Sequence, residues 1–240
     1  MPERVELSVV IPAYNEQQRI GQSLDRLRAY CDREHPQYEV LVVDDGSSDR
    51  TAELVAERCA GWPALELLRM ERNRGKGAAT RRGVLRTRGE WVLCSDADLS
   101  TPIEYLAPLL AAGEQNEVVI GSRAVAGAQI TRRQPVYRVL MGRVFNWVVR
   151  ALTAPGLQDT QCGFKLFRRD AARAIFSRTA IDGFAFDVEA LFIAHRLGYR
   201  IAEVPVAWHN DERSKVRLIR DPARMFLDVI AVRWHHRDLG

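Results

Sequence analysis

Two aspartates one residue apart, Asp96 and Asp98, directly follow the apolar run Trp91–Cys94. Such a run indicates a buried strand, and carboxylates that leave its end together can reach one divalent cation from an exposed loop. Ser100 and Thr101 extend the oxygen-rich stretch, and oxygen ligands are those that Mg²⁺ or Mn²⁺ selects. A cation held there would bind a diphosphate and stabilise the charge on a leaving nucleoside diphosphate. An ordinary turn is the alternative explanation for an isolated pair of this kind.

A second acidic segment, Asp44–Asp49, follows the apolar run Val40–Val43. A carboxylate at the end of a strand could accept hydrogen bonds from a base or a ribose, and we expect this of Asp44. The same residues are also typical of a turn, so we expect Asp45 to be structural and Asp49 to cap the next helix.

A basic residue between two glycines, Gly75-Lys76-Gly77, precedes a helix expected over Ala78–Arg86. This arrangement predicts that the backbone can approach an anion, while the helix N-terminus and Lys76 stabilise its charge. Glycines ahead of helices are common, so this segment alone is weak evidence for an anion site. Its expected place at the same sheet edge as the Asp-rich segments strengthens that evidence.

The elements that position these residues alternate along the first half of the chain. Apolar runs predict strands at Leu7–Ile11, Val40–Val43, Leu65–Leu68, Trp91–Cys94 and Val118–Ile120, with helices between them. We expect Pro12 to end the first strand, Tyr14-Asn15-Glu16 to open a helix, and Ile103–Ala112 to be helical. The alternation predicts an α/β fold with a Rossmann-like, mostly parallel central sheet flanked by helices. Ligands of such sheets bind at the carboxyl ends of the strands, where the Asp-rich and Gly-rich segments fall.

The composition favours an ordinary globular domain. With 240 residues, of which 47% are hydrophobic, the chain can bury a core, and no apolar run approaches the roughly 20 residues that cross a bilayer. The charged N-terminus does not resemble a signal peptide, and the cysteines are widely spaced without a CxxC pair. We therefore expect a protein of the reducing cytoplasm, without a zinc ribbon or a disulfide framework. The net charge of +4 is modest, and its basic clusters suit phosphate groups or an anionic membrane surface, with solvated helix faces as the alternative for any single arginine. We expect no nucleic acid among the partners.

Two stretches of the second half, residues 136–152 and 222–236, mix large apolar side chains and tryptophan with arginine. This pattern predicts amphipathic helices. Core packing and contact with a membrane surface both remain open for each of them.

Further polar groups of the second half could serve a site. Asp159–Lys165 combines polar side chains, a glycine and a cation in a segment too irregular for simple core. Asp187 and Glu189 lie two residues apart, so on a helix they diverge and only one can face a pocket. We favour Asp187, as a general base, a contact to a sugar hydroxyl or a helix cap.

Five ordered motifs resemble those of family 2 glycosyltransferases with the GT-A fold. They are Val10–Glu16, Asp44–Ser47, Asn73–Gly77, Asp96-Ala97-Asp98 and Gly121-Ser122-Arg123. Within that family the chain looks most like the polyprenyl-phosphate branch, and Asp159–Lys165, Phe186–Glu189 and Ser214-Lys215-Val216 resemble the dolichyl-phosphate β-glucosyltransferases. The resemblance implies a single GT-A domain over residues 1–240, with a nucleotide-sugar half at 7–123 and an acceptor half at 124–240.

The resemblance also implies roles for individual residues. The nucleotide-sugar contacts would be Pro12, Tyr14, Glu16, Asp44, Lys76, Asp96 and Ala97. The metal, Mg²⁺ or Mn²⁺, would be bound by Asp96, Asp98 and Ser100, although many mannosyl-transferring relatives carry glutamine at the position of Ser100. Arg123, Arg143 and, by its charge and place, Lys165 would contact the phosphate of the acceptor, and Asp98, Asp187 and Arg123 would be catalytic.

The implied activity is inverting transfer of a hexose, glucose from UDP-glucose first of all, onto a polyprenyl or dolichyl phosphate. The enzyme would bind peripherally to the cytoplasmic face of a membrane, with its amphipathic stretches bringing the site to the bilayer. Three alternatives stay open: mannose transfer from GDP-mannose, transfer to a hydroxyl acceptor with Asp187 as the base, and a non-catalytic nucleotide-binding or scaffolding protein.

Overall fold

The structure, a computed structural model, describes residues 5–130, 156–208, 228–229 and 231–239 of the chain. The strands are β1 (Leu7–Ala13), β2 (Tyr38–Asp44), β3 (Leu65–Arg69), β4 (Trp91–Cys94), β5 (Val118–Ser122), β6 (Gln129–Ile130), β7 (Lys165–Arg168), β8 (Ile201–Pro205) and β9 (Ala207–Trp208). The helices are α1 (Ile20–Glu34), α2 (Thr51–Cys59), α3 (Lys76–Arg86), the 3₁₀ turn η1 (Ile103–Tyr105), α4 (Leu106–Gly113), α6 (Arg169–Phe176) and α7 (Phe186–Arg196).

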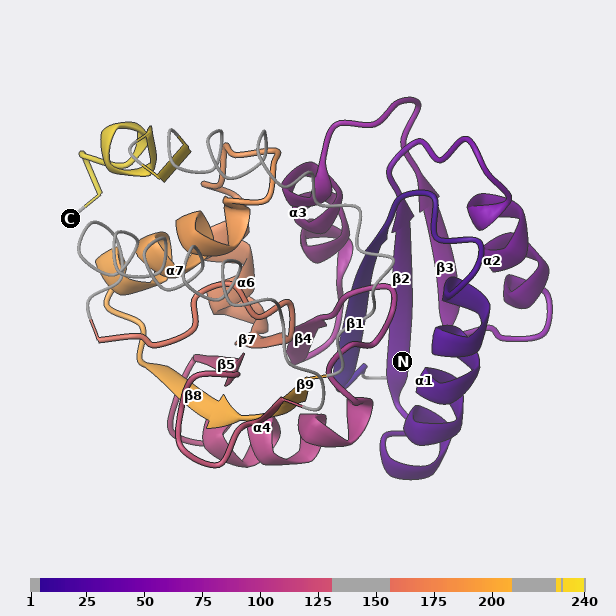
Figure 1. The fold of residues 1–240 in the computed structure, drawn as a ribbon, viewed down its shortest axis with the longest axis horizontal. Coiled ribbons are helices and arrows are strands. Elements are labelled where there is room, and N and C mark those ends of the chain that lie inside the picture. Colours follow the sequence, from indigo (N-terminus) through magenta and orange to yellow (C-terminus); the bar gives the residue numbers. More distant parts are fainter. Residues whose placement is uncertain (1–4, 131–155, 209–227, 230, 240) are drawn as a thin grey trace.

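Among these residues seven strands form one sheet in the order β3-β2-β1-β4-β7-β5-β8, which runs from right to left in Figure 1. All neighbouring strands are parallel except at β7, which runs antiparallel to both β4 and β5. The predicted α/β class with a mostly parallel sheet is therefore confirmed. A strand of the second half, β7, separates β4 from β5.

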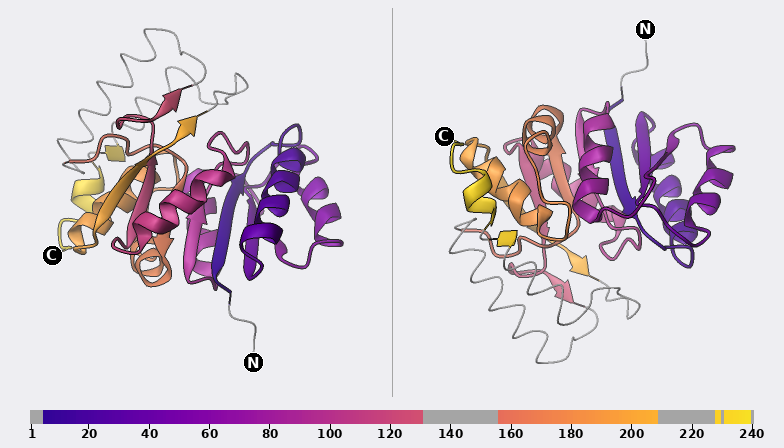
Figure 2. Two further views of the ribbon diagram at one scale, coloured as in Figure 1. Left: turned by 90° about the horizontal axis from the view of Figure 1, so that it is seen from below. Right: turned by 90° about the horizontal axis from the view of Figure 1, so that it is seen from above.

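Helices cover both faces of the sheet (Figures 1 and 2). Alternate residues of β1 show how the two layers divide. Val9 and Ile11 pack into a core with the apolar stripes of α1 and α4, whereas Val10 packs into a second core with α3, α6 and α7. The side-chain period of two in a strand thus sends successive residues of β1 to opposite layers.

The start of the chain differs from the sequence prediction at two points. Pro12 does not end the first strand, because β4 pairs with β1 only as far as Val10, and β2 continues beside Pro12. Proline is tolerated where a strand lacks a neighbour on one side. Helix α1 begins at Ile20 rather than at Tyr14, since Asn15 has a left-handed backbone (φ 54°) and the amide of Ile20 bonds to the carbonyl of Glu16.

The remaining element predictions need only small changes. The stretch expected as one helix over Ile103–Ala112 is divided into η1 and α4, and α3 begins two residues earlier than expected, at Lys76. Residues 228–229 and 231–235 are helical and lie beside α7 (Figure 2). Among the described helices, none combines the length and the apolar character that a bilayer-spanning helix needs. The stretch 136–152 and residues 222–227 of the second amphipathic stretch lie outside the described residues.

Candidate active site

The predicted site residues that the structure describes meet near the carboxyl ends of β1, β2 and β4, where β7 begins. β7 is antiparallel to β4 and its first residue, Lys165, lies opposite the last residue of β4, Cys94. The antiparallel insertion therefore brings the segment 159–164 to the edge where Asp96 and Asp98 leave β4. Residues from both halves of the chain share one edge of one sheet.

The loop after β2 is held by the carboxylate of Asp45. Its oxygens accept hydrogen bonds from the amide of Arg74 and the amide of Gly75, both at 2.8 Å, and from Asn73 Nδ2 at 2.9 Å. Burial raises the pKa of Asp45 against the lowering effect of these amides. Asp45 is thus structural, as expected, and its contacts tie the loop after β2 to the loop before α3.

Asp44 is fully buried and accepts the amide of Ser47 at 3.4 Å. Asp49 accepts the amide of Thr51, the first residue of α2, at 2.9 Å, but the N-cap position of α2 is Arg50 and not Asp49 as expected. Whether Asp44 contacts a nucleoside remains a prediction.

The segment after β1 is fastened to the loop after β2. The amide of Asn15 donates to Ser47 Oγ at 2.9 Å, and the amide of Ser48 donates to Asn15 Oδ1 at 2.8 Å. These bonds explain the left-handed backbone of Asn15, and they leave Tyr14 39% exposed beside the loop. Four predicted nucleoside contacts, Pro12, Tyr14, Glu16 and Asp44, therefore lie on two adjoining segments.

Glycine is needed on both sides of Lys76 for a different reason from the one expected. The amides of Gly77 and Ala78 donate to the carbonyl oxygen of Asp182 at 2.8 and 3.3 Å, so a neighbouring loop, and not an anion, satisfies these amides of α3. A Cβ on Gly75 would lie 2.3 Å from that same oxygen, and one on Gly77 would lie 2.3 Å from the carbonyl oxygen of Ile181. The prediction that this helix end binds an anion through its backbone is therefore wrong for the amides of Gly77 and Ala78. The cation of Lys76 remains at the site.

Each acid of the predicted metal pair has a cationic partner. Lys76 Nζ lies 2.5 Å from Asp96 Oδ1, and Arg19 Nη1 lies 3.2 Å from Asp98 Oδ2. Burial favours a higher pKa for Asp96, but the charge and hydrogen bond of Lys76 outweigh it and lower that pKa. In turn, burial favours a lower pKa for Lys76, and the carboxylates of Asp96 and Asp187 outweigh it and raise that pKa. Both groups of the Lys76–Asp96 pair are therefore charged at neutral pH.

The turn after Asp96 is unusual in its backbone. Leu99 has a left-handed φ of 47° although it is a buried leucine, and its amide bonds to the carbonyl of Asp96 at 3.1 Å. Such strain persists only where packing imposes it and is frequent at functional sites. Ser100 Oγ donates to Asp98 Oδ1 at 2.7 Å and so helps to orient that carboxylate.

A divalent cation fits this donor set. No group of three or more His, Cys, Asp or Glu side chains that could hold a metal lies in the part of the chain that the structure describes. Asp96 and Asp98 offer carboxylate oxygens, and Mg²⁺ commonly uses one or two carboxylates together with the phosphates of a substrate. The two aspartates would hold the cation jointly with a diphosphate, and Ser100 as a third ligand remains a prediction.

On the acceptor side, Arg123 forms a two-pronged ion pair with Asp159. Its Nε and Nη2 donate to the two carboxylate oxygens at 2.7 and 2.9 Å, and its guanidinium lies 5.4 Å from the ring centroid of Trp208. Burial favours a higher pKa for Asp159, but the hydrogen bonds and charge of Arg123 lower it. The pair anchors the loop 159–164 to the end of β5.

Lys165 and Asp187 form a second, more deeply buried pair. Lys165 is 2% exposed, and its Nζ lies 2.5 Å from Asp187 Oδ1 and 2.5 Å from the carbonyl oxygen of Cys162. Glycine is required in the same loop, because a Cβ on Gly163 would lie 2.2 Å from Asp96 Oδ2. The loop thus packs directly on the acid of the predicted metal pair.

Asp187 and Glu189 diverge on α7, as expected. Asp187 faces the site, whereas Glu189 accepts the amides of Ala180 and Ile181 at 2.9 Å and contacts His236 Nε2 at 2.8 Å. Arg143, the remaining predicted contact of an acceptor phosphate, lies outside the described residues.

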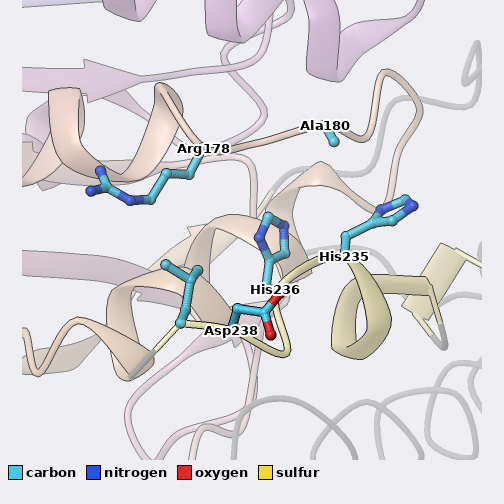
Figure 3. A pocket seen from close by; sticks show the side chains of 6 residues that line it. Arg178, Ala180, His235, His236 and Asp238 are labelled. Atoms are coloured by element: carbon cyan, nitrogen blue, oxygen red, sulfur yellow. The ribbon is translucent and has the colours of Figure 1, made fainter.

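A pocket of about 460 Å³ lies beside the C-terminal helical residues (Figure 3). Its lining residues are Arg178, Ala180, His235, His236, Asp238 and Leu239. Since none of the predicted site residues lines it, this pocket is separate from the acid pairs.

Sequence reasoning missed two contributors to the site, Arg19 and Asp182. Arg19 is separated from Asp98 by 79 positions, and it lies just before α1, where nothing in the local spacing marks it. Asp182 holds the start of α3 through its carbonyl oxygen, which every residue possesses, and through a carboxylate that pairs with Arg74 and Arg81, both far from it in the sequence. No local sequence signal could therefore have found either contact.

Comparisons with known proteins place the chain in a family. Residues 8–176 match the model of a family described as glycosyl transferase family 2. The chain is 35% identical to a dolichyl-phosphate beta-glucosyltransferase of Dictyostelium discoideum, over 98% of the chain and 76% of that protein. It is 36% identical to the Homo sapiens protein of the same name, over 95% of the chain and 75% of that protein. These matches confirm the resemblance inferred from the motifs.

Solved structures confirm the fold. Mannosyl-3-phosphoglycerate synthase from Rubrobacter xylanophilus superposes with a TM-score of 0.70 at 21% identity, over 98% of this chain and 75% of that one. Glucosyl-3-phosphoglycerate synthase from Mycobacterium tuberculosis, solved with uridine diphosphate, gives a TM-score of 0.67 at 24% identity, over 98% of this chain and 81% of that one. The predicted GT-A architecture is thereby confirmed.

Proposed function

Because the chain belongs to glycosyl transferase family 2, we propose that this glycosyltransferase moves glucose from UDP-glucose to a polyprenyl phosphate such as dolichyl phosphate. The relatives named dolichyl-phosphate beta-glucosyltransferase, which match nearly the whole chain, support the hexose and the acceptor. The observation that carries the proposal is the cluster of Asp96, Asp98 and Lys76 at the carboxyl end of β4.

On the donor side, the nucleoside contacts Pro12, Tyr14, Glu16 and Asp44. The hydrogen bonds between Asn15 and the Ser47–Ser48 segment support this assignment, because they hold the two contributing segments together. Lys76 and the Asp96-Ala97 segment lie next to the diphosphate and the sugar. The charged ammonium of Lys76 is suited to bind a phosphate oxygen of the donor.

Asp96 and Asp98, with Ser100, would hold Mg²⁺ or Mn²⁺. When bound, the cation supplies electrostatic stabilisation of the diphosphate that leaves. The residues of the chain position the donor so that its anomeric carbon faces the acceptor, and Lys76 neutralises part of the charge that develops on the diphosphate. One displacement forms the bond from acceptor oxygen to anomeric carbon and breaks the bond to the diphosphate, which inverts the configuration at that carbon.

The acceptor phosphate is already anionic, so it attacks without a strong general base. We assign Asp187 to orienting the sugar or the acceptor, because Lys165 holds its carboxylate in an ion pair. The burial of Lys165 in that pair favours a role in holding Asp187 over the expected contact with the acceptor phosphate. Arg123, whose side chain is 28% exposed, and Arg143 are the proposed phosphate contacts.

The lipid acceptor requires that the site reach a membrane. We propose peripheral binding at the cytoplasmic face through the C-terminal helical residues, where Trp234 is 73% exposed. The neighbouring side chains of Arg233 and Arg237 are also exposed, and basic residues with an interfacial tryptophan are typical of helices that lie on anionic bilayers.

A donor screen with the purified protein tests the proposal. Short-chain polyprenyl phosphate, Mg²⁺ or Mn²⁺ and one nucleotide sugar at a time are combined, and the lipid product is identified by mass. We expect a polyprenyl-phosphate hexose with UDP-glucose, and no product when polyprenol replaces the phosphate. Transfer to polyprenol, or transfer only from GDP-mannose, would contradict the proposal and support one of the alternatives.

Asp98→Asn tests the acid pair. Loss of one carboxylate of the proposed metal site should lower kcat by at least about 100-fold, because the charge on the leaving diphosphate is then poorly stabilised. The Kd for UDP, measured by calorimetry, should change by less than about threefold, since the nucleoside contacts remain. Asp25→Asn, which alters an exposed ion pair with Arg58, serves as the control and should keep parental activity. Near-normal turnover of Asp98→Asn would refute the assignment.

A further inference from the structure

The loop between α6 and α7 covers the start of α3. Within it, the carbonyl oxygen of Asp182 accepts the amides of Gly77 and Ala78. The carboxylate of Asp182 receives Arg81 Nη2 at 2.6 Å and Arg74 Nη2 at 3.0 Å. One residue of this loop thus contacts α3 and the segment before it through both its main chain and its side chain.

The other side of the same loop is held by Glu189. Its carboxylate is fully buried and accepts the amides of Ala180 and Ile181, both at 2.9 Å. Because a carboxylate offers an acceptor oxygen to each amide, both main-chain donors are satisfied at once. The ring of His236, which points toward the Arg178–Ala180 segment in Figure 3, contacts Glu189 Oε1 at 2.8 Å.

The loop and the start of α3 fit together without spare room. The Cβ that any other residue would carry at position 75 or 77 would lie 2.3 Å from a carbonyl oxygen of this loop. The loop therefore cannot move closer to α3 unless α3 moves with it, and a larger displacement away from α3 would break the bonds of Gly77 and Ala78. Lys76, which lies between the two glycines and pairs with Asp96, moves with them.

We propose that Glu189 is a positioning residue for donor binding, which sets the place of Lys76 through the loop 180–183. His236 joins the C-terminal helical residues to the same carboxylate, so the position of that helix and the position of Lys76 are coupled. The inference rests on the proposed function in one respect, the assignment of Lys76 to the nucleotide-sugar donor. The mechanical link between Glu189 and α3 is independent of that assignment.

Amide hydrogen exchange of the unliganded protein tests the link. In Glu189→Gln the amide side chain offers one acceptor oxygen in place of two, so one main-chain donor of the loop loses its partner. We expect the peptide that covers residues 73–80 to exchange about tenfold faster than in the parent. Asp182→Asn, which weakens the contacts with Arg74 and Arg81 at a side chain that is 34% exposed, should give a smaller increase of about threefold. This second variant decides the question alone if Glu189→Gln does not fold.

Kinetics separate positioning from a general loss of stability. We expect Glu189→Gln to raise the KM for the sugar nucleotide about fivefold, while kcat and the KM for the polyprenyl phosphate change less than about twofold. Glu117→Gln is the matched control. Glu117 also accepts the main-chain amide and the guanidinium of one residue, Arg200. It precedes β5 and so lies at the amino ends of the parallel strands, away from the candidate site. Its replacement should leave the donor KM and the exchange at 73–80 unchanged.

Unchanged exchange at 73–80 in both loop variants, with faster exchange at 178–185, would show that the loop is released without α3 and would overturn the proposal. A rise in the acceptor KM in place of the donor KM would overturn it as well. If the parent transfers no sugar in the donor screen, the proposed function fails, yet the exchange measurement still decides whether Glu189 holds α3.

Discussion

At the scale of single residues, four acids of the candidate site are each paired with a cation of the chain. The pairs are Asp96–Lys76, Asp98–Arg19, Asp159–Arg123 and Asp187–Lys165. An isolated buried charge is costly, and a partner within hydrogen-bond distance offsets most of that cost. The pairs therefore hold these four carboxylates in fixed orientations without a ligand.

Gly163→Ala tests how closely the loop 159–164 must approach Asp96. The added Cβ would lie 2.2 Å from Asp96 Oδ2, so either the loop or the carboxylate has to move. We expect the rate of sugar transfer to fall at least about tenfold, because small displacements of a catalytic group are costly. Initial rates with saturating donor measure the effect. Gly61→Ala, where nothing lies within 4 Å of the new Cβ, is the control, and equal rates for the two variants would count against the contact.

At the scale of elements, the antiparallel strand β7 decides where the second half of the chain meets the first. Its register places Lys165 opposite Cys94, and the loop before it therefore packs on Asp96. The loop after α6 packs on the first half in the same way, because the carbonyl oxygen of Asp182 accepts the amides at the start of α3. Two loops of the second half thus pack on motifs of the first and complete the candidate site.

Trp234→Ala tests the proposed membrane contact of the C-terminal helix. Val229 and Val232 are buried on its inner side, so the exposed ring of Trp234 can be removed without disturbing the core. We expect the partition coefficient onto phosphatidylcholine vesicles that contain phosphatidylglycerol to fall about tenfold in a sedimentation assay. Leu85→Ala, at an exposed apolar residue of α3, should bind vesicles as the parent does. Equal binding of Trp234→Ala and the parent would place the membrane contact elsewhere.

At the scale of the whole molecule, one sheet joins both halves of the chain. Strands β7 and β8 come from the second half and take places beside β4 and β5. Ion pairs across this junction, above all Arg123 with Asp159, couple the stability of the halves to the ionisation of a few acids. The loss of folding stability at low pH should therefore measure the contribution of the ion pairs between the two halves.

Asp159→Asn measures that coupling. The folded-state pKa of Asp159 is lowered, so its charge contributes stability above the unfolded pKa of about 3.9 and loses it as the pH falls through the folded pKa. We expect the variant to be less stable by about 2 kcal/mol at pH 7 in urea unfolding, and the difference to narrow below about pH 4. Asp25→Asn, in an exposed pair, should stay within about 0.5 kcal/mol of the parent at either pH. A difference for Asp159→Asn that does not depend on pH would reject the ion pair as its cause.

The amino-acid sequence by itself determined the elements and the motifs. Mostly apolar runs, interrupted only by Ser8 in β1 and Glu66 in β3, predicted the strands from β1 to β5, because a strand covered on both faces needs apolar residues at successive positions. The Asp-rich and Gly-rich segments fell at their carboxyl ends, and the divergence of Asp187 and Glu189 followed from helix geometry alone. These features depend on residues a few positions apart, which is the range that spacing and periodicity describe.

Only the tertiary structure decided what the polar groups contact. Arg19 reaches Asp98 across 79 positions, Gly77 donates to Asp182, and β7 enters the sheet in the antiparallel sense. Each of these outcomes depends on which distant segments pack together, and the free energy of that packing is a property of the whole chain that no local pattern contains. The sequence alone suggested that the glycines beside Lys76 make room for an anion. In the structure they make room for the carbonyl oxygens of Ile181 and Asp182, which lie in the distant loop between α6 and α7.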